Sequence, residues 1–189
     1  DNIYHEHYNY WSLTSLETFF KRFSSTIYRA EKIDTHGGSI RIYIKKSKKV
    51  KIEKNVRELL KVEEKYGIKN YQTYKDFAKK VYKIRENVRK NIFQLASKET
   101  KIIGYGSPAK ATTALNFFGI SNEIKCIVED NKLKQGKYLP GMRIPITSKE
   151  NIKTKPDCAI VLAWNFMDEI KRKNINLAHK FISIKDLEK

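Results

Sequence analysis

The chain has 189 residues, 40% of them hydrophobic, which is enough to bury one good core or two small ones. Its formal charge of +18 would suit an anionic partner (a nucleotide, a nucleic acid or a membrane surface), but the lysines are spread over nearly every segment, so a biased overall composition explains them better. No apolar run approaches the roughly 20 residues of a membrane helix and no signal peptide is evident, so we expect a cytoplasmic protein. Cys126 and Cys158 lie in separate apolar runs, so we expect no disulfide.

The first eleven residues, DNIYHEHYNYW, are dense in aromatic and ionisable side chains. Two histidines without further cysteine or histidine nearby form only a weak zinc pattern, so we assign no metal site. If Ile3–His7 is a strand, His5 points away from Tyr4 and Glu6; if it is a loop at the carboxyl edge of a sheet, all of them can converge on a ligand. A histidine satisfied within an aromatic cluster is a third interpretation.

A helix and a hairpin are predicted next. Thr14 and Glu17 have the spacing of a capping box, and an apolar stripe predicts a helix that ends near Ser24. Thr26–Asp34 and Ser39–Lys45 have the composition of strands, and the intervening THGG predicts a turn between them.

A lysine-rich connector leads into two helices. Lys45–Lys54 fits a solvated linker better than a nucleic-acid or lipid contact. Asn55–Tyr66 is a predicted helix ended by Gly67, and Tyr71–Lys98 is a long helix with one apolar face that we expect to bridge two lobes.

From Lys101 onward the pattern alternates between strand and helix. Lys101–Gly104 predicts a short buried strand, and Ala109–Phe118 has helical spacing. Gly104 and Gly106 between them permit a tight turn and close approach by a phosphate.

The residues that begin this helix suit an anion site. Ser107 is a good N-cap and Pro108 suits the first helical position. The free N–H groups of a helix start attract anions, and Lys110 would add a positive charge. The same pattern is equally that of an ordinary corner in a parallel sheet.

Three further strand-like segments complete a predicted parallel, doubly wound sheet: Glu123–Glu129, Asp157–Trp164 and Lys180–Ile184. Asp130, at the end of the first of these, is placed to accept hydrogen bonds from a ribose, although the glycines do not form a GxGxxG fingerprint. The segment Asn131–Ile146 is predicted to be a loop, with a turn at its Pro-Gly pair, and Asn165–Lys173 a helix.

Four separated motifs, in order, resemble one family. YHEH followed by YWS and a helix, then GYGSPAKATTALNFFGI, VEDNKLKQGKYLPGMRIPI and LAWNFMDEI are similar to the successive motifs of S-adenosylmethionine-dependent sugar C-methyltransferases. The resemblance covers the whole chain. It implies methyl transfer to a ring carbon of a nucleotide-linked 4-keto-deoxy sugar.

The resemblance also implies an α/β protein in three parts. Residues 1–50 would be the C-terminal remnant of a class I methyltransferase-like, methyl-donor-binding domain, residues 51–98 bridging helices, and residues 99–189 a Rossmann-like C-methyltransferase C-terminal domain. The family's zinc-binding lobe and the glycine-rich loop for S-adenosylmethionine have no counterpart in this sequence, so we expect the later part of a longer protein, with donor binding lost or supplied by a separate chain.

Catalytic roles are carried over from the resemblance to the YHEH motif. His7 would be the base that removes the proton beside the ketone, a step that needs a base within about 3 Å and a stabilised enolate. Glu6 would orient and tune its imidazole, and Tyr4 would bind near the keto oxygen or the sugar, while His5 matches no role.

Substrate-binding residues are expected at the mouth of the C-terminal sheet. The turn and helix start would hold the diphosphate of the nucleotide-linked sugar, and the loops after the later strands would hold the rest of it. The predicted set is Gly104, Gly106, Ser107, Lys110, Asp130, Lys134, Tyr138 and Asn165, with Gln135 and Trp164 beside them. Tyr138 and Trp164 are equally suited to packing.

Two further functions remain open beside the methyltransferase. One is a non-catalytic nucleotide-sugar-binding remnant of a split or truncated gene. The other is nucleic-acid binding, which rests on charge alone and is disfavoured because aromatic residues are not interleaved with a basic groove.

Overall fold

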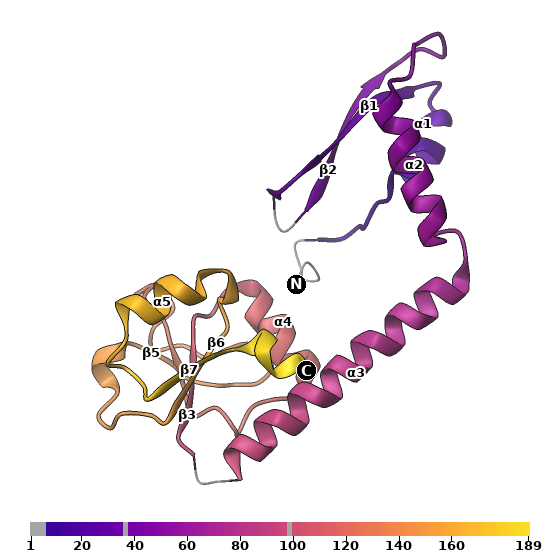
Figure 1. The fold of residues 1–189 in the computed structure, drawn as a ribbon. Helices are drawn as coiled ribbons and strands as arrows, with labels where there is room; N and C mark the ends of the chain where they lie inside the picture. The colour runs from indigo at the N-terminus through magenta and orange to yellow at the C-terminus, as the bar shows by residue number, and fades with distance from the viewer. Residues whose placement is uncertain (1–6, 36–37, 98–99) are drawn as a thin grey trace. The chain divides into compact units, whose positions relative to one another are not determined.

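The computed structural model describes residues 7–35, 38–97 and 100–189 (Figure 1). The described chain forms two compact units, residues 7–79 and residues 80–189, and each has a hydrophobic core of its own. The helix predicted over residues 55–66 packs with the first unit, and the long helix contributes to both units; the three-part domain division stays a prediction.

In the first unit two helices pack on a two-stranded antiparallel sheet. The elements are α1 (Leu13–Lys21), β1 (Thr26–Ile33), β2 (Ser39–Lys45) and α2 (Lys54–Tyr66). β1 and β2 run from the pair Thr26↔Lys45 to the pair Ile33↔Ser39, which confirms the predicted hairpin. His36 and Gly37 of its predicted turn lie outside the described residues.

The start of α1 corrects the predicted capping box. Ser12, not Thr14, is the N-cap, and its side chain and that of Ser15 each accept the other's backbone N–H. Thr14 instead donates its N–H and its hydroxyl to Glu63 of α2 (2.8 and 2.7 Å). The same carboxylate accepts the N–H of Leu13 at 2.7 Å, so a residue 50 positions away supplies the negative charge at this helix start.

The long helix α3 (Tyr71–Ala96) follows a short corner. Gly67 adopts a left-handed conformation (φ 71°) and ends α2, as predicted. Val88 and Ile92 of α3 are fully buried in the core of the second unit. In the part of the chain that the structure describes, neither α3 nor any other helix has the length and apolar composition needed to cross a membrane.

The second unit holds a five-stranded parallel sheet, which confirms the predicted fold class. Its strands, in the spatial order β5-β4-β3-β6-β7, are β3 (Ile102–Tyr105), β4 (Ile127–Val128), β5 (Ile146–Thr147), β6 (Cys158–Val161) and β7 (Lys180–Ser183). Two differences from prediction concern the β4–β5 edge. β4 is shorter than expected, and β5 forms at the end of the segment predicted to be a loop.

Helices cover both faces of this sheet. α4 (Ala109–Phe118), part of α3 and the final 3-10 helix η4 (Ile184–Glu188) contribute to one core cluster, whereas α5 (Met167–Lys173) contributes to the other. Because β3 has β4 on one side and β6 on the other, the chain reverses its direction of winding there. Ligands of such sheets bind outside the carboxyl ends of the strands at this switch point.

Candidate functional site

The turn after β3 is shaped by two glycines that pack closely. A Cβ at Gly104 would lie 3.0 Å from Ile127 and 3.1 Å from Leu162, so this glycine serves close packing between strands. Gly106 has φ +85°, and a Cβ there would lie 2.8 Å from the Cβ of Ala163. Gly106 therefore requires glycine before any ligand is considered, and Gly104 allows closer packing than a larger residue would.

The helix start after this turn differs from prediction. The N-cap of α4 is Pro108, and no side chain caps the helix. Ser107 is buried and instead donates its N–H and its hydroxyl to Oε2 of Glu129 (2.8 and 2.6 Å). Glu129 lies at the end of β4, so the turn after β3 is tied to the neighbouring strand by the protein's own carboxylate.

Hydrogen bonds keep Glu129 ionised in a confined position. Burial acts to raise the pKa of its carboxyl group, but the donors on Ser107 and the N–H of Asn131, together with the charge of Lys134, lower it overall. Lys134 lies 3.9 Å from Glu129 and donates to the carbonyl oxygen of Ser107 (2.8 Å). Lys134 therefore neutralises part of this charge and closes the turn.

Asp130 faces a tyrosine. Oη of Tyr105 lies 3.0 and 3.1 Å from the two carboxylate oxygens of Asp130, to which it donates. The side-chain amide of Asn174 donates to the same phenol oxygen at 3.0 Å. Burial raises the pKa of Tyr105, and the neighbouring Asp130 raises it further, so the phenol stays protonated.

A cavity of about 310 Å³ opens at the switch point between these groups, which we call the switch-point cavity. Its walls come from the turns after β3, β4 and β6 and from α5. Of the predicted substrate residues it brings together Gly106, Ser107, Asp130 and Lys134, whereas Gly104, Lys110, Tyr138 and Asn165 do not line it.

Lys110 takes part in a second cluster at the carboxyl edge. Its Nζ lies 4.2 Å from the ring centroid of Trp164, and Nζ of Lys185 lies 5.5 Å from the same centroid. The three residues follow β3, β6 and β7, respectively. Burial lowers the pKa of Lys110, and the charge of Lys185 lowers it further. Two ammonium groups held beside one indole form a site suited to an anion.

The two remaining predicted contacts are exposed. Tyr138 is 65% exposed and forms an isolated antiparallel bridge with Pro145. Asn165 is exposed within the 3-10 helix η3 (Trp164–Phe166). Neither contacts the switch-point cavity, so a substrate role for them stays a prediction.

Of the predicted catalytic motif the structure describes one member. His7 is half-buried, and its ring makes an edge-on contact with Tyr10 at a centroid distance of 6.4 Å. Tyr4, His5 and Glu6 lie outside the described residues. Within residues 7–35, 38–97 and 100–189, no group of three or more His, Cys, Asp or Glu side chains could hold a metal ion.

Sequence reasoning missed four residues at this edge: Tyr105, Glu129, Asn174 and Lys185. Glu129 ends a predicted strand and Tyr105 directly follows one, and strand ends at the carboxyl edge of a parallel sheet are a signal for site residues. Asn174 and Lys185 had no local signal, because the tertiary fold alone brings them to Tyr105 and Trp164.

Two comparisons with known proteins agree on a relationship. A family model described as "C-methyltransferase C-terminal domain" matches residues 34–183. The chain is 35% identical over 173 residues to C-methyltransferase NovU of Streptomyces niveus. This alignment covers 90% of the chain and 41% of NovU, so the chain spans about two fifths of that relative's length.

Proposed function

Since the chain belongs to the C-methyltransferase family and carries its C-terminal domain, we propose that it binds a nucleotide-linked 4-keto-deoxy sugar and takes part in its C-methylation. The methyl donor of this reaction would be S-adenosylmethionine.

The observation that carries the proposal is the pair of lysines beside Trp164. Lys110 reaches the indole ring from the first turn of α4, and Lys185 reaches it from the 3-10 helix η4, both at the carboxyl edge. A diphosphate is the anionic part of a nucleotide-linked sugar, and it would relieve the repulsion between these amines. Trp164 would add an apolar surface for the sugar or the base.

The switch-point cavity supports the same assignment. It lies at the position where sheets of this strand order bind nucleotides, and its wall carries the carboxylate of Asp130, a suitable acceptor for ribose hydroxyl groups. Tyr105 and Asn174 hold that carboxylate in place.

For the chemistry we propose that His7 removes the proton on the carbon beside the ketone. The donor would supply the methyl group: the enolate carbon would form a bond to the methyl carbon as the carbon–sulfur bond breaks, with the electron pair remaining on the sulfur. Glu6 would orient His7, and Tyr4 would bind the keto oxygen or the sugar. The glycine-rich loop for the donor would come from sequence outside this stretch, in the same polypeptide or in a separate chain.

Calorimetric titration with thymidine diphosphate tests the binding half of the proposal. We expect binding that weakens about tenfold in Lys110→Ala and in Lys185→Ala, because each removes one charged hydrogen-bond donor. Lys125→Ala is the matched control, since this exposed lysine precedes β4 and lies toward the opposite edge of the sheet. Equal affinity in all four proteins would contradict a diphosphate site at Trp164.

A methyl-transfer assay tests the catalytic half. The chain would be incubated with a thymidine-diphosphate-linked 4-keto-6-deoxy sugar and methyl-labelled donor, with and without a methyltransferase domain that binds the donor. We expect a methylated sugar only when that domain is present, and loss of product in His7→Ala. Binding of the nucleotide without product in either mixture would indicate a non-catalytic binding protein.

A further inference from the structure

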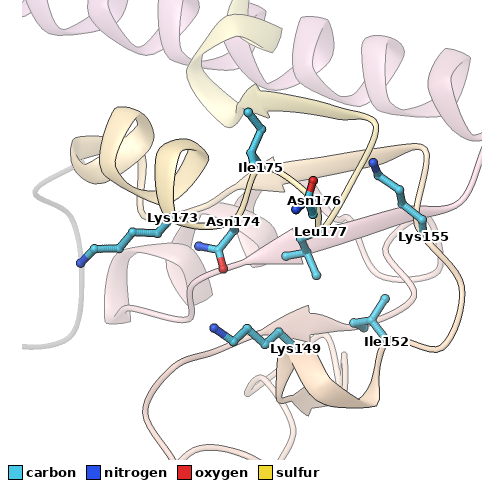
Figure 2. A pocket seen from close by; sticks show the side chains of 8 residues that line it. All are labelled: Lys149, Ile152, Lys155, Lys173, Asn174, Ile175, Asn176 and Leu177. Atoms are coloured by element: carbon cyan, nitrogen blue, oxygen red, sulfur yellow. The ribbon is translucent and has the colours of Figure 1, made fainter.

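A second cavity, of about 370 Å³, lies on the α5 side of the sheet and has no role in the proposed function. The cavity lies between two segments of the chain: the connection from β5 to β6, and the end of α5 with the loop that leads to β7. Figure 2 shows the two segments on opposite sides of this space, with the side chains of Lys173 and Ile175 pointing away from it. We call it the lysine cavity; its walls are Lys149, Ile152, Lys155, Lys173, Asn174, Ile175, Asn176 and Leu177.

The charge of this lining is unbalanced. Three of its eight residues are lysines, and none is a carboxylate. Lys173 pairs with Glu169 one helical turn earlier (2.5 Å). Within the described chain, Lys149 and Lys155 form no ion pair within 4 Å, although Lys149 acts electrostatically on its neighbour Glu150, which is not part of the lining.

This concentration of lysine differs from the protein's other lysine-rich surfaces. On the helices, lysines such as Lys21 and Lys54 pair with a glutamate four positions away and extend over convex surface. Lys173 has such a pair, but among the described residues Lys149 and Lys155 line the lysine cavity without one, so an anion bound there would be attracted by both charges.

The wall also has an apolar part. Ile152 and Leu177 pack against the buried cluster beneath α5 and present their remaining surface to the cavity. Figure 2 shows Lys149 and Ile152 on one segment, with Asn174 and Leu177 opposite them. Cations beside an apolar wall favour a ligand that has both an anionic and an apolar part.

We propose that the lysine cavity binds a small organic phosphate. The phosphate would be bound by Lys149 and Lys155, whose long side chains can turn toward it, and the apolar or planar part would lie against Ile152 and Leu177. The site is distinct from the Lys110 cluster, which faces the core cluster on the other side of the sheet.

The lysine cavity shares Lys173 and Asn174 with the switch-point cavity. The side-chain amide of Asn174 donates hydrogen bonds to Tyr105 and to the carbonyl oxygen of Ile170. These two bonds fix the orientation of the Asn174 side chain. A ligand in the lysine cavity therefore contacts a residue that also holds the Tyr105–Asp130 pair.

Nuclear magnetic resonance titration of the ¹⁵N-labelled chain with phenyl phosphate tests this proposal. We expect concentration-dependent shifts in residues 149–155 and 173–177, with weaker binding of inorganic phosphate. The variant K149Q/K155Q should lose about tenfold or more in affinity for phenyl phosphate, because two charged donors are removed.

Two controls separate this site from general charge and from the proposed function. K83Q/K90Q makes the same charge change on the exposed face of α3 and should leave affinity within about twofold. Lys110→Ala should also leave it unchanged, whatever happens to thymidine diphosphate binding. Equal losses in both double variants, shifts confined to the Lys110 cluster, or equal affinity for inorganic and phenyl phosphate would each overturn the proposal.

Discussion

The side chain of Glu129 links the turn after β3 to the turn after β4 in the second unit. Its carboxylate is 13% exposed and accepts hydrogen bonds from Ser107 and from the N–H of Asn131. Since Ser107 is itself buried, removal of the acceptor leaves buried donors without a partner.

We predict that Glu129→Gln lowers the free energy of unfolding by about 2 kcal/mol, because charged hydrogen bonds are replaced by weaker ones and one donor loses its acceptor. Chemical denaturation at pH 7 measures this loss. Glu123→Gln is the control, since within the described residues its carboxylate accepts a local hydrogen bond from the N–H of Ser121 and no distant one.

The pH dependence of this effect has a definite sign. The pKa of Glu129 is lowered in the folded protein from the ordinary glutamate value of 4.5, so the unfolded chain binds its proton first as the pH falls. The stabilisation is complete above pH 4.5 and is lost as the pH falls through the lower folded value. The difference between wild type and Glu129→Gln should therefore shrink below pH 4.5; a constant difference would contradict this account.

The proposed diphosphate binding depends on the positive charge of Lys110. Burial and the charge of Lys185 lower its pKa from the ordinary value of 10.5. Affinity for thymidine diphosphate should therefore decline with rising pH before an ordinary lysine would lose its proton, and the decline should be absent in Lys110→Arg. Calorimetry between pH 7 and the alkaline unfolding limit, with the phosphate fully ionised throughout, measures this difference.

At the scale of elements, the β3–α4 corner depends on Gly106. The position combines a positive φ with a clash between any Cβ and Ala163. We predict that Gly106→Ala lowers the free energy of unfolding by about 2–4 kcal/mol.

Gly136→Ala is the matched control for that prediction. Gly136 also has a positive φ (+76°), but an added Cβ would meet nothing within 4 Å. Gly136→Ala should therefore lower the free energy of unfolding by only about 1 kcal/mol, the cost of placing a non-glycine residue at a positive φ. Equal losses at the two positions would mean that contact with Ala163 contributes nothing.

Sequence patterns predicted the regular elements well and their junctions less well. The hairpin, α2 with its glycine stop, α4 and the parallel sheet followed from periodicity and turn residues. The capping box failed because Ser12 was the nearer cap and Glu63, distant in sequence, bonded Thr14. β5 was missed because a two-residue strand has no periodicity.

In the candidate site, too, local sequence patterns predicted residues near the strand ends but not the contacts between residues distant in sequence. Gly106, Ser107, Asp130 and Lys134 were predicted because they follow strands at one edge of a parallel sheet, and they line one cavity; their role in binding stays a prediction. The sequence could not predict that Glu129 would bond Ser107, or that Lys185 would share Trp164 with Lys110, because both contacts depend on tertiary packing.

At the scale of the whole molecule, the two units rest on separate cores. Val56 is buried with Leu13 in the first, and Ile92 with Ile160 in the second. We predict that Ile92→Ala, which removes about 2–5 kcal/mol of packing, lowers hydrogen-exchange protection in β3 and β6 and leaves β1 and β2 unchanged. Val56→Ala should do the reverse. Loss of protection in both units from either change would show one cooperative structure.

The bond between Glu129 and Ser107 has a consequence for ligand choice. In sheets of this strand order, backbone N–H groups at the first glycine turn grip a phosphate and fix its position closely. Here an internal counter-anion already occupies part of that grip. A phosphate at this turn would be repelled by Glu129, so under the proposed function the diphosphate would be bound by lysine amines such as Lys110. Because an amine on a long side chain recognises charge more than shape, such a site would tolerate variation in the molecule attached to the phosphate.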